Sequence, residues 1–251
     1  MPIIQALDRA LRILDLFDEQ TPELKLTEIS ARMNLHKSTA HALLRTLQIH
    51  GYIEQDEESG KYRLGLRLLE KGQLLLQNLD IRNVARPHLQ ALSDETGQTT
   101  HLLILDGREG VYIDKVEGAQ AAIRYSRIGR RVPLHSSASG KVLAAFQPPA
   151  ALERLLAGYG YARHTPNTID SEALFRRELE EVRKTGCAFD REENEPGVMC
   201  IAAPIFGHDG GLLAAMSLSC MTARVDEAEA KRLAERVRKT AAEISARLGH
   251  R

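Results

Sequence analysis

The stretch from residue 27 to residue 64 constrains the fold of this chain more than any other part. Two segments, Thr27–Met33 and a second that begins at Lys37, carry apolar residues at three- and four-residue spacing, and the short turn Asn34-Leu35-His36 separates them. Residues 53–64 follow as two β-rich runs around a Gly-containing turn. A helix, a tight turn, a second helix and a hairpin together predict a winged helix-turn-helix.

The second of these helices has a polar face that suits DNA. Its apolar residues would bury one side, which leaves the other side for a partner. That free side offers hydroxyls, an imidazole, an ammonium and a guanidinium, which can bind phosphate oxygens and base edges in a major groove. These residues are Lys37, Ser38, Thr39, His41 and Arg45. Because no carboxylate lies between Glu28 and Glu54, this side would not repel phosphates. We therefore predict double-stranded operator DNA as a partner.

The second strand of the predicted hairpin adds two basic residues. Lys61 and Arg63 are two positions apart and fall on one strand face. We expect them to contact the DNA backbone beside the groove, which fixes register without reading sequence. The alternative is that this three-helix unit is a structural or protein-contact module.

The overall charge limits how the chain could hold DNA. Its 251 residues suit two domains, and its 34 basic and 34 acidic side chains cancel. A neutral molecule cannot stay on DNA through bulk electrostatics, so dimerisation has to supply affinity. This balance favours a specific regulator over a DNA-packaging protein.

Composition also excludes several classes. No apolar run reaches membrane-spanning length, and the amphipathic N-terminal segment lacks a signal-peptide core, so we expect a cytoplasmic protein with no membrane partner. The three cysteines, Cys187, Cys200 and Cys220, have no spacing typical of a zinc site or a disulfide framework. We expect reduced thiols, no metal and no cofactor.

The rest of the chain predicts a linker and a second domain. Residues 65–79 read as a linker helix with more leucines than one small domain can hide, which favours a homodimer or homotetramer. Strands in hairpins with helices gathered elsewhere then indicate an α+β sensor domain and not a Rossmann sheet. The expected helices are 81–96, 139–146, 150–157, 171–185 and 226–248, and the expected strands are 99–105, 110–116, 121–125, 200–206 and 212–219. We assign residues 1–64 to the winged helix-turn-helix domain, 65–79 to the linker helix and 80–251 to the second domain.

Three motifs in the second domain resemble those of a known family. They are Pro133-Leu134-His135-Ser136-Ser137-Ala138-Ser139-Gly140-Lys141, Asp190-Arg191-Glu192-Glu193, and Gly197-Val198-Met199-Cys200-Ile201-Ala202-Ala203-Pro204-Ile205. In this order, behind a winged helix-turn-helix, they resemble the IclR family of bacterial transcriptional regulators over essentially the whole chain. The resemblance implies a GAF-like effector-binding domain at residues 80–251, dimers through the N-terminal domain and often tetramers through the C-terminal domains.

The same motifs give weaker support for an enzyme. Ser139-Gly140-Lys141 suggests a phosphate loop, but a Walker A motif needs a glycine where His135 stands. Cys200 with His135 could form a nucleophile and base, and Asp190 with Glu192 an acid/base pair, yet no helper motif accompanies either pair. We predict no catalytic residues and no enzyme activity.

The motifs make better sense as a binding site for a small acid. Small residues at a helix start leave backbone N–H groups free to bind an anion. The resemblance implies that the amides of Ala138 and Ser139 hold a carboxylate and that four polar side chains surround it: Asp190, Cys200, Ser217 and Ser219. Strand alternation places Ser217 and Ser219 on one face. The alternative for each serine is an ordinary sheet hydroxyl.

The segment Arg124–Arg131 bears on the identity of the acid. It resembles the KdgR-like branch of the family, which responds to a keto-deoxy sugar acid. Arg124 stands where other members place an apolar pocket residue, and its guanidinium would suit a carboxylate or a hydroxyl-rich ligand. We expect Arg127, Arg130 and Arg131 on a solvated or oligomer-facing edge. The predicted effector is a small acidic metabolite such as a keto or sugar acid, with an aromatic acid as the alternative.

Two motif residues have open roles. His135 either caps or packs its loop. Lys141 either pairs with Asp190 or Glu192 or contacts the ligand directly. We expect a repressor-like switch in which the effector changes the spacing of paired DNA-binding domains, although the family contains activators as well as repressors.

Overall fold

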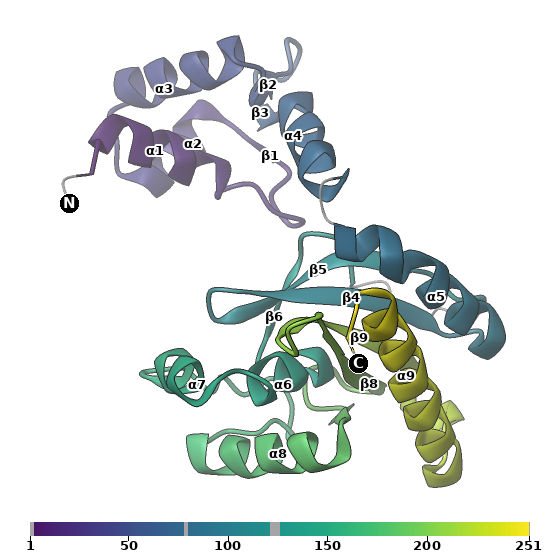
Figure 1. Ribbon diagram of the computed structural model, residues 1–251. Helices are drawn as coiled ribbons and strands as arrows, with labels where there is room; N and C mark the ends of the chain where they lie inside the picture. Colours follow the sequence, from purple (N-terminus) through teal and green to yellow (C-terminus); the bar gives the residue numbers. More distant parts are fainter. Residues whose placement is uncertain (1–2, 78–79, 121–125, 251) are drawn as a thin grey trace. The chain divides into compact units, whose positions relative to one another are not determined.

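The computed structural model describes residues 3–77, 80–120 and 126–250. The chain divides into two compact units, Met1–Asn78 and Leu79–Arg251 (Figure 1). Each unit has its own hydrophobic core.

The first unit is the predicted winged helix-turn-helix. Its elements are α1 (Gln5–Leu14), β1 (Glu23–Leu24), α2 (Leu26–Met33), α3 (Lys37–Ile49), β2 (Ile53–Gln55), β3 (Tyr62–Leu64) and α4 (Leu66–Gln77). The core joins the first three helices to the hairpin, because Ile13, Ile29, Leu44 and Ile53 are completely buried against one another. Leucine and isoleucine at helical spacing thus supply the packing that orients α3.

The turn between α2 and α3 forms through local hydrogen bonds. Asn34 ends α2 with φ of 51°, a left-handed conformation that asparagine tolerates better than most residues. The Leu35 N–H donates to the Ser30 carbonyl at 3.0 Å, and the Ser30 hydroxyl donates to the Leu35 carbonyl at 2.6 Å. These bonds fix where α3 starts.

One strand of this unit was not predicted. β1 pairs antiparallel with β3, so the wing is a three-stranded sheet of order β1-β3-β2. A strand of two residues shows no alternation in the sequence, which is why the pattern missed it.

The second unit is built on one antiparallel sheet of order β6-β5-β4-β9-β8-β7. Its strands are β4 (Thr99–Asp106), β5 (Glu109–Val116), β6 (Arg131–Pro133), β7 (Ala188–Arg191), β8 (Val198–Phe206) and β9 (Leu212–Met221). Its helices are α5 (Asp80–Thr96), α6 (Ala138–Ala145), α7 (Pro149–Leu156), α8 (Glu172–Thr185) and α9 (Glu227–Arg247), with a 3-10 turn at Thr222–Arg224. The α+β prediction is confirmed; β6 and β7 were not predicted, and the expected strand at 121–125 lies outside the described residues.

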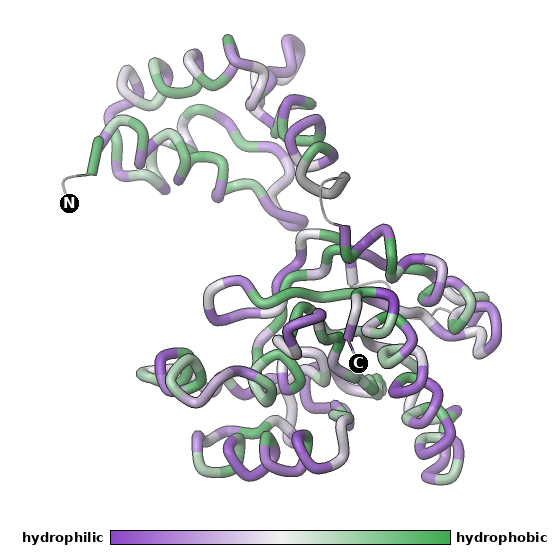
Figure 2. The backbone as a smooth tube through the Cα atoms, viewed as in Figure 1, coloured by the Kyte–Doolittle hydropathy of each residue, from purple (hydrophilic) through white to green (hydrophobic). Residues whose placement is uncertain are grey.

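Helices cover both faces of this sheet. α5 and α9 pack on one face, while α6, α7 and α8 lie on the other (Figure 1). The strands between them are largely hydrophobic, whereas α9 alternates between hydrophobic and hydrophilic residues along its length (Figure 2). This is the pattern expected for a sheet that is buried on both sides by amphipathic helices.

Three further observations concern chemistry. In the described part of the chain, no helix is long and apolar enough to cross a membrane. Within the same residues, no group of three or more His, Cys, Asp or Glu side chains could hold a metal ion. Cys187, Cys200 and Cys220 are free thiols.

Candidate functional site

The polar face of α3 is open to solvent. Its sequence-predicted DNA-binding residues are all exposed: Lys37, Ser38, Thr39, His41 and Arg45. The opposite side of the helix is anchored in the core by Ala40, Leu44 and Leu47. The helix therefore presents short and long polar side chains on a rigid support, as a DNA recognition helix requires.

The wing residues have acidic neighbours. Lys61 Nζ lies 3.6 Å from Glu23 Oε2, and an Arg63 guanidinium nitrogen lies 3.2 Å from Glu54 Oε2. Both pairs are partly exposed, and such pairs contribute at most about 1 kcal/mol. Phosphate oxygens could replace these carboxylates at low cost.

A small cavity of about 30 Å³ lies against the sheet of the second unit. This volume holds one water molecule, so an effector of even a few carbon atoms requires the cavity to expand. The lining residues come from several strands and the turns beside them: His101, Tyr112, Ser126, Arg130, Val132, Asp190, Asn194, Glu195, Val198, Cys200 and Ser219. Three predicted effector residues, Asp190, Cys200 and Ser219, thus lie around one cavity.

Sheet register brings these three residues together. Asp190 pairs with Cys200 across β7 and β8, and Cys200 pairs with Ser219 across β8 and β9. Cys200 Sγ and Ser219 Oγ are 3.0 Å apart. Ser217 is buried two residues earlier on β9, where it pairs with His101, but it does not line the cavity.

Asp190 is the most perturbed acid at this site. Its side chain is 2% exposed, and its Oδ1 accepts the N–H groups of Glu193 at 2.7 Å and Asn194 at 3.2 Å. Burial raises the pKa of Asp190 to about 7, although the two N–H donors oppose this shift. Near neutral pH this carboxyl can therefore act as an acceptor or, when protonated, as a donor. Burial also raises the pKa of Cys200, so its thiol stays neutral and is a poor nucleophile.

The start of α6 lies close to this cavity. Ser137 caps the helix by accepting the Gly140 N–H at 3.1 Å, and Ala138 and Ser139 are buried. The first N–H groups of a helix have no partner within the helix. Neither Ala138 nor Ser139 lines the cavity, but the Ser136 hydroxyl in the preceding turn donates to Asn194 Oδ1 at 3.1 Å.

Lys141 has different partners from those predicted. It is 1% exposed, and its Nζ donates to Glu193 Oε1 at 2.7 Å, to Glu178 Oε1 at 3.0 Å and to the Phe189 carbonyl at 2.7 Å. The expected pairing with Asp190 or Glu192 is wrong. Glu192 has φ of 60°, and its carboxylate accepts the Gly197 N–H instead. Lys141 therefore holds the turn that follows β7, and the backbone of that turn donates the N–H groups of Glu193 and Asn194 to Asp190.

A loop that the sequence did not single out holds the same turn. Thr165 Oγ1 donates to the Glu192 carbonyl at 2.6 Å, and Thr168 Oγ1 donates to the Glu193 carbonyl at 2.6 Å. Asn167 Nδ2 donates to the Arg191 carbonyl at 3.1 Å. Side-chain bonds to a distant backbone leave no periodic signal in a sequence.

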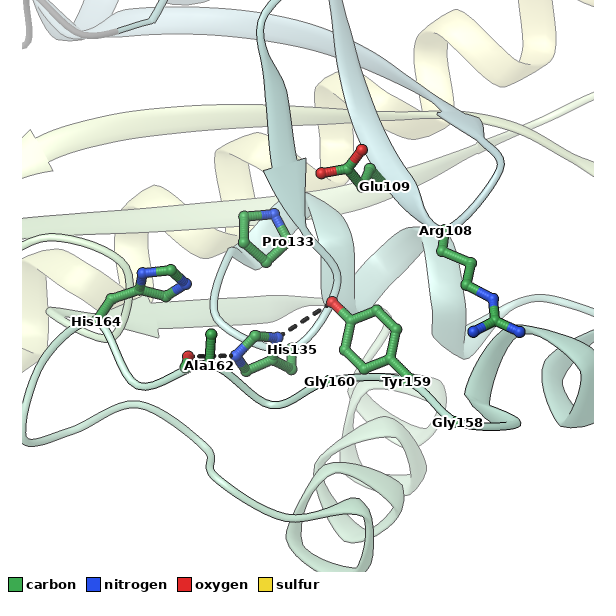
Figure 3. Close-up of a pocket in the computed structure, with 9 residues that line it drawn as sticks. All are labelled: Arg108, Glu109, Pro133, His135, Gly158, Tyr159, Gly160, Ala162 and His164. Atoms are coloured by element: carbon green, nitrogen blue, oxygen red, sulfur yellow. Dashed lines mark hydrogen bonds between the residues drawn. The ribbon is translucent and has the colours of Figure 1, made fainter. Parts of the chain in front are cut away.

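His135 packs against its own loop and the loop after α7, which is one of the two roles that the sequence left open for it. Its Nε2 lies 2.9 Å from the Ala162 carbonyl and its Nδ1 lies 3.1 Å from the Tyr159 hydroxyl (Figure 3). Burial lowers the pKa of His135, which favours the neutral ring. The ring lines a different cavity, open and of about 340 Å³, together with Arg108 and His164.

The arginines before β6 differ in their surroundings. Arg131 is exposed and pairs with Asp106 and Glu109, as expected for a solvated edge. Arg130 lines the small cavity, so its assignment to that edge is wrong. Arg124 lies outside the described residues.

Comparison with known proteins identifies the family. Residues 73–246 match the model for the bacterial transcriptional regulator IclR C-terminal domain, and residues 6–57 match the model for the IclR helix-turn-helix domain. The chain is 53% identical over 250 residues to the HTH-type transcriptional regulator XynR of Escherichia coli (strain K12), covering 100% of this chain and 99% of XynR. It is 39% identical over 228 residues to KdgR of the same organism, covering 91% of this chain and 87% of KdgR.

A solved structure supports the same assignment along the whole chain. The IclR homolog from Microbacterium hydrocarbonoxydans, crystallised in complex with 4-hydroxybenzoate, matches with a TM-score of 0.83 and 28% identity over 97% of this chain and 98% of the homolog. XynR and KdgR are named as regulators, which are not enzymes. The chain therefore belongs to the IclR family of helix-turn-helix transcriptional regulators and binds DNA.

Proposed function

We propose that this regulator represses a catabolic operon and that a small carboxylate, such as a keto or sugar acid, switches it. The observation that carries the proposal is the convergence of Asp190, Cys200 and Ser219 on one cavity beside the start of α6. The cavity needs to expand to take an acid, so binding would favour a different local arrangement from the one described.

The DNA-binding half of the proposal rests on α3. Paired α3 helices, one from each protomer, would read a pseudo-palindromic operator through Thr39, His41 and Arg45. Lys37 and Ser38 at the start of the helix would bind phosphate, and the wing residues Lys61 and Arg63 would fix register.

The effector half rests on the charge of the cavity. We propose that the amides of Ala138 and Ser139 bind the carboxylate, because a helix start favours an anion. Asp190, Cys200, Ser217 and Ser219 would surround the remainder of the ligand, with Arg124 as a further contact from the sugar-acid resemblance. The cationic Arg130 on the cavity wall supports an acidic ligand, which would compete with the lining Glu195 carboxyl for this charge.

Exposed leucines and isoleucines support an oligomer. In α1 and the residue before it, Ile4, Leu7 and Leu11 are 71%, 55% and 54% exposed, and in α4 Leu66 and Leu69 are 69% and 58% exposed. Several exposed apolar side chains on neighbouring turns favour burial against a second protomer. We propose a homodimer or homotetramer in which the effector changes the spacing of the DNA-binding domains through α4.

An aromatic acid is the alternative effector. The IclR homolog from Microbacterium hydrocarbonoxydans was crystallised with 4-hydroxybenzoate, and in this chain the rings of His101 and Tyr112 lie 5.0 Å apart at the cavity. Such rings could pack against a benzoate.

The test is an anisotropy titration of the promoter DNA nearest the gene, with an unrelated DNA of equal length as control. We expect tight, specific binding that one acid from a panel of sugar acids, keto acids and aromatic acids weakens. Tighter binding with the acid would indicate an activator or a co-repressed system. No acid effect at all would contradict the proposed switch.

A further inference from the structure

His101 is a buried group that the proposed site does not yet use. It lies on β4, lines the small cavity and is 1% exposed. Its Nε2 is 2.7 Å from the Ser126 hydroxyl. Its Nδ1 is buried and finds no hydrogen-bond partner in the described part of the chain. Most buried polar atoms are satisfied, so an exception beside a cavity needs a reason.

The chemical state of His101 limits what it can bind. Burial lowers the pKa of His101 to about 3, and the nearby Lys115 ammonium acts in the same direction. The ring is therefore neutral at physiological pH and does not attract a carboxylate as a cation would. A neutral ring nitrogen pairs well with a hydroxyl or keto group, as donor or acceptor according to its tautomer.

The groups around His101 have the same character. The Tyr112 ring packs against it at 5.0 Å, and burial raises the pKa of Tyr112, so its phenol keeps its proton. The Cys200 thiol and the Ser219 hydroxyl lie on the same cavity. Among the described lining residues, Arg130 is the cation, and burial raises the pKa of the two lining carboxyls, Asp190 and Glu195, which favours their neutral forms. Neutral donors and acceptors beside one cation suit a ligand with one acid group and further polar oxygens.

Packing alone does not explain why a histidine occupies position 101. A phenylalanine or leucine would pack beside Tyr112 without burying an unsatisfied nitrogen, which costs free energy. The Ser126 hydroxyl meanwhile fixes one ring nitrogen and leaves the other in a constant position. The ring is held in one orientation while only one of its two nitrogens has a hydrogen-bond partner in the described part of the chain. It is therefore organised to bind a further group through Nδ1.

We propose that His101 is a specificity residue that binds a hydroxyl or keto oxygen of the effector through Nδ1, and that the effector is a hydroxylated carboxylic acid. The inference rests on the proposed function, since it assumes that an acid enters this cavity. It adds that the acid is recognised away from its carboxylate as well, with Ser126 as the positioning residue.

Two matched pairs of acids test the inference. D-Gluconate and hexanoate share a six-carbon carboxylate with and without hydroxyls, and 4-hydroxybenzoate and benzoate form the aromatic pair. Calorimetric titration of the full chain should show at least about tenfold preference for the hydroxylated member of one pair. Equal affinity within both pairs would overturn the inference but leave an acid effector standing. Binding of none of the four acids would contradict the acid effector class itself and this inference with it.

Variants of His101 separate recognition from packing. Gln keeps a polar atom near Nε2 and loses Nδ1, whereas Asn keeps one near Nδ1 and loses the bond to Ser126. We expect His101→Gln to lower the preference for the hydroxylated acid about tenfold with little change for the plain acid, and His101→Asn to retain part of it. Ser126→Ala, which removes only the anchor, should lower the preference about threefold.

A merely structural role predicts a different result. It would weaken both acids of a pair together in each variant, and an unchanged preference in His101→Gln would refute the proposal. Thermal unfolding of each variant reports folding. If His101→Gln does not fold, the preference in Ser126→Ala decides, because that change leaves the ring in place.

Discussion

Replacing Lys141 by methionine tests whether a buried ion cluster holds the turn beside Asp190. The Lys141 side chain is 1% exposed, and its partners Glu193 and Glu178 are 11% and 33% exposed. Methionine preserves most of the length of lysine without the charge. Lys141→Met therefore leaves the Glu193 carboxylate in a buried site without its cation, whereas Glu178 can turn toward water.

The expected magnitude follows from this burial. Removing one partner of a buried pair costs about 3–5 kcal/mol, and we take the lower end, about 3 kcal/mol, because Glu178 can regain solvent. At about 2–4 °C per kcal/mol for a domain of this size, the melting temperature should fall by about 6–12 °C. Burial raises the pKa of Glu193 and Lys141 opposes that shift. Without Lys141 the Glu193 carboxyl binds its proton more tightly in the folded state, so the loss should be larger at pH 8 than at pH 5.

Calorimetry of the full chain at both pH values measures this loss, with the two units followed as separate transitions. Adding Glu193→Gln to Lys141→Met should recover part of the stability, because it removes the unpaired charge. Glu178→Gln is the matched control and should cost at most about 1 kcal/mol, as for other partly exposed pairs. A loss below about 1 kcal/mol at pH 8 for Lys141→Met would refute the reasoning.

Three further predictions address DNA, pH and effector. Thr39→Ala with Arg45→Ala should abolish operator binding in anisotropy titrations and leave oligomerisation intact, while Arg232→Ala on α9 should bind normally; retained operator affinity would remove α3 from the interface. Because the pKa of Asp190 is raised to about 7 from 3.8, the folded state binds a proton that the unfolded state releases, so stability should fall by up to about 4 kcal/mol between pH 4 and pH 7. Asp190→Asn should flatten this dependence in urea unfolding, and an unchanged slope would contradict the assignment. Ser219→Ala should weaken the effector response about tenfold at constant operator affinity, and an unaltered response would exclude that hydroxyl.

The DNA-binding domain could be predicted because its signals are local. The buried faces of α2 and α3 repeat at helical spacing, and Asn34 occupies the left-handed position that ends α2. The hairpin turn is likewise local, since Asp56 Oδ1 accepts both the N–H and the hydroxyl of Ser59. Each of these features can be recognised within a window of a few residues.

The cavity residues depend on long-range register, which periodicity does not contain. Asp190, Cys200 and Ser219 belong to three different strands, and only the pairing of those strands makes them neighbours. The family resemblance supplied these residues, whereas strand alternation supported only the shared face of Ser217 and Ser219. Neither the resemblance nor periodicity indicated that Thr165 and Thr168 hold the turn after β7. Loop hydroxyls that donate to a remote backbone carbonyl look like any surface hydroxyl in a sequence.

The arginines before β6 show how one missed strand changes a site. Tyr112 accepts the N–H of Gly129 at 2.8 Å and donates to the carbonyl of Arg130 at 3.1 Å, so the pairing with β5 begins before β6 itself. Alternation then sends Arg130 and Val132 to the cavity side and Arg131 to the solvent side, where it meets acidic residues. When no strand is assigned to a run of arginines, its side chains cannot be divided between two faces. We therefore placed Arg127, Arg130 and Arg131 together on a solvated or oligomer-facing edge. Because β6 contributes the apolar Val132 and the residue just before it contributes the Arg130 cation, the charge of the effector and the fit of its carbon skeleton depend on the same short segment.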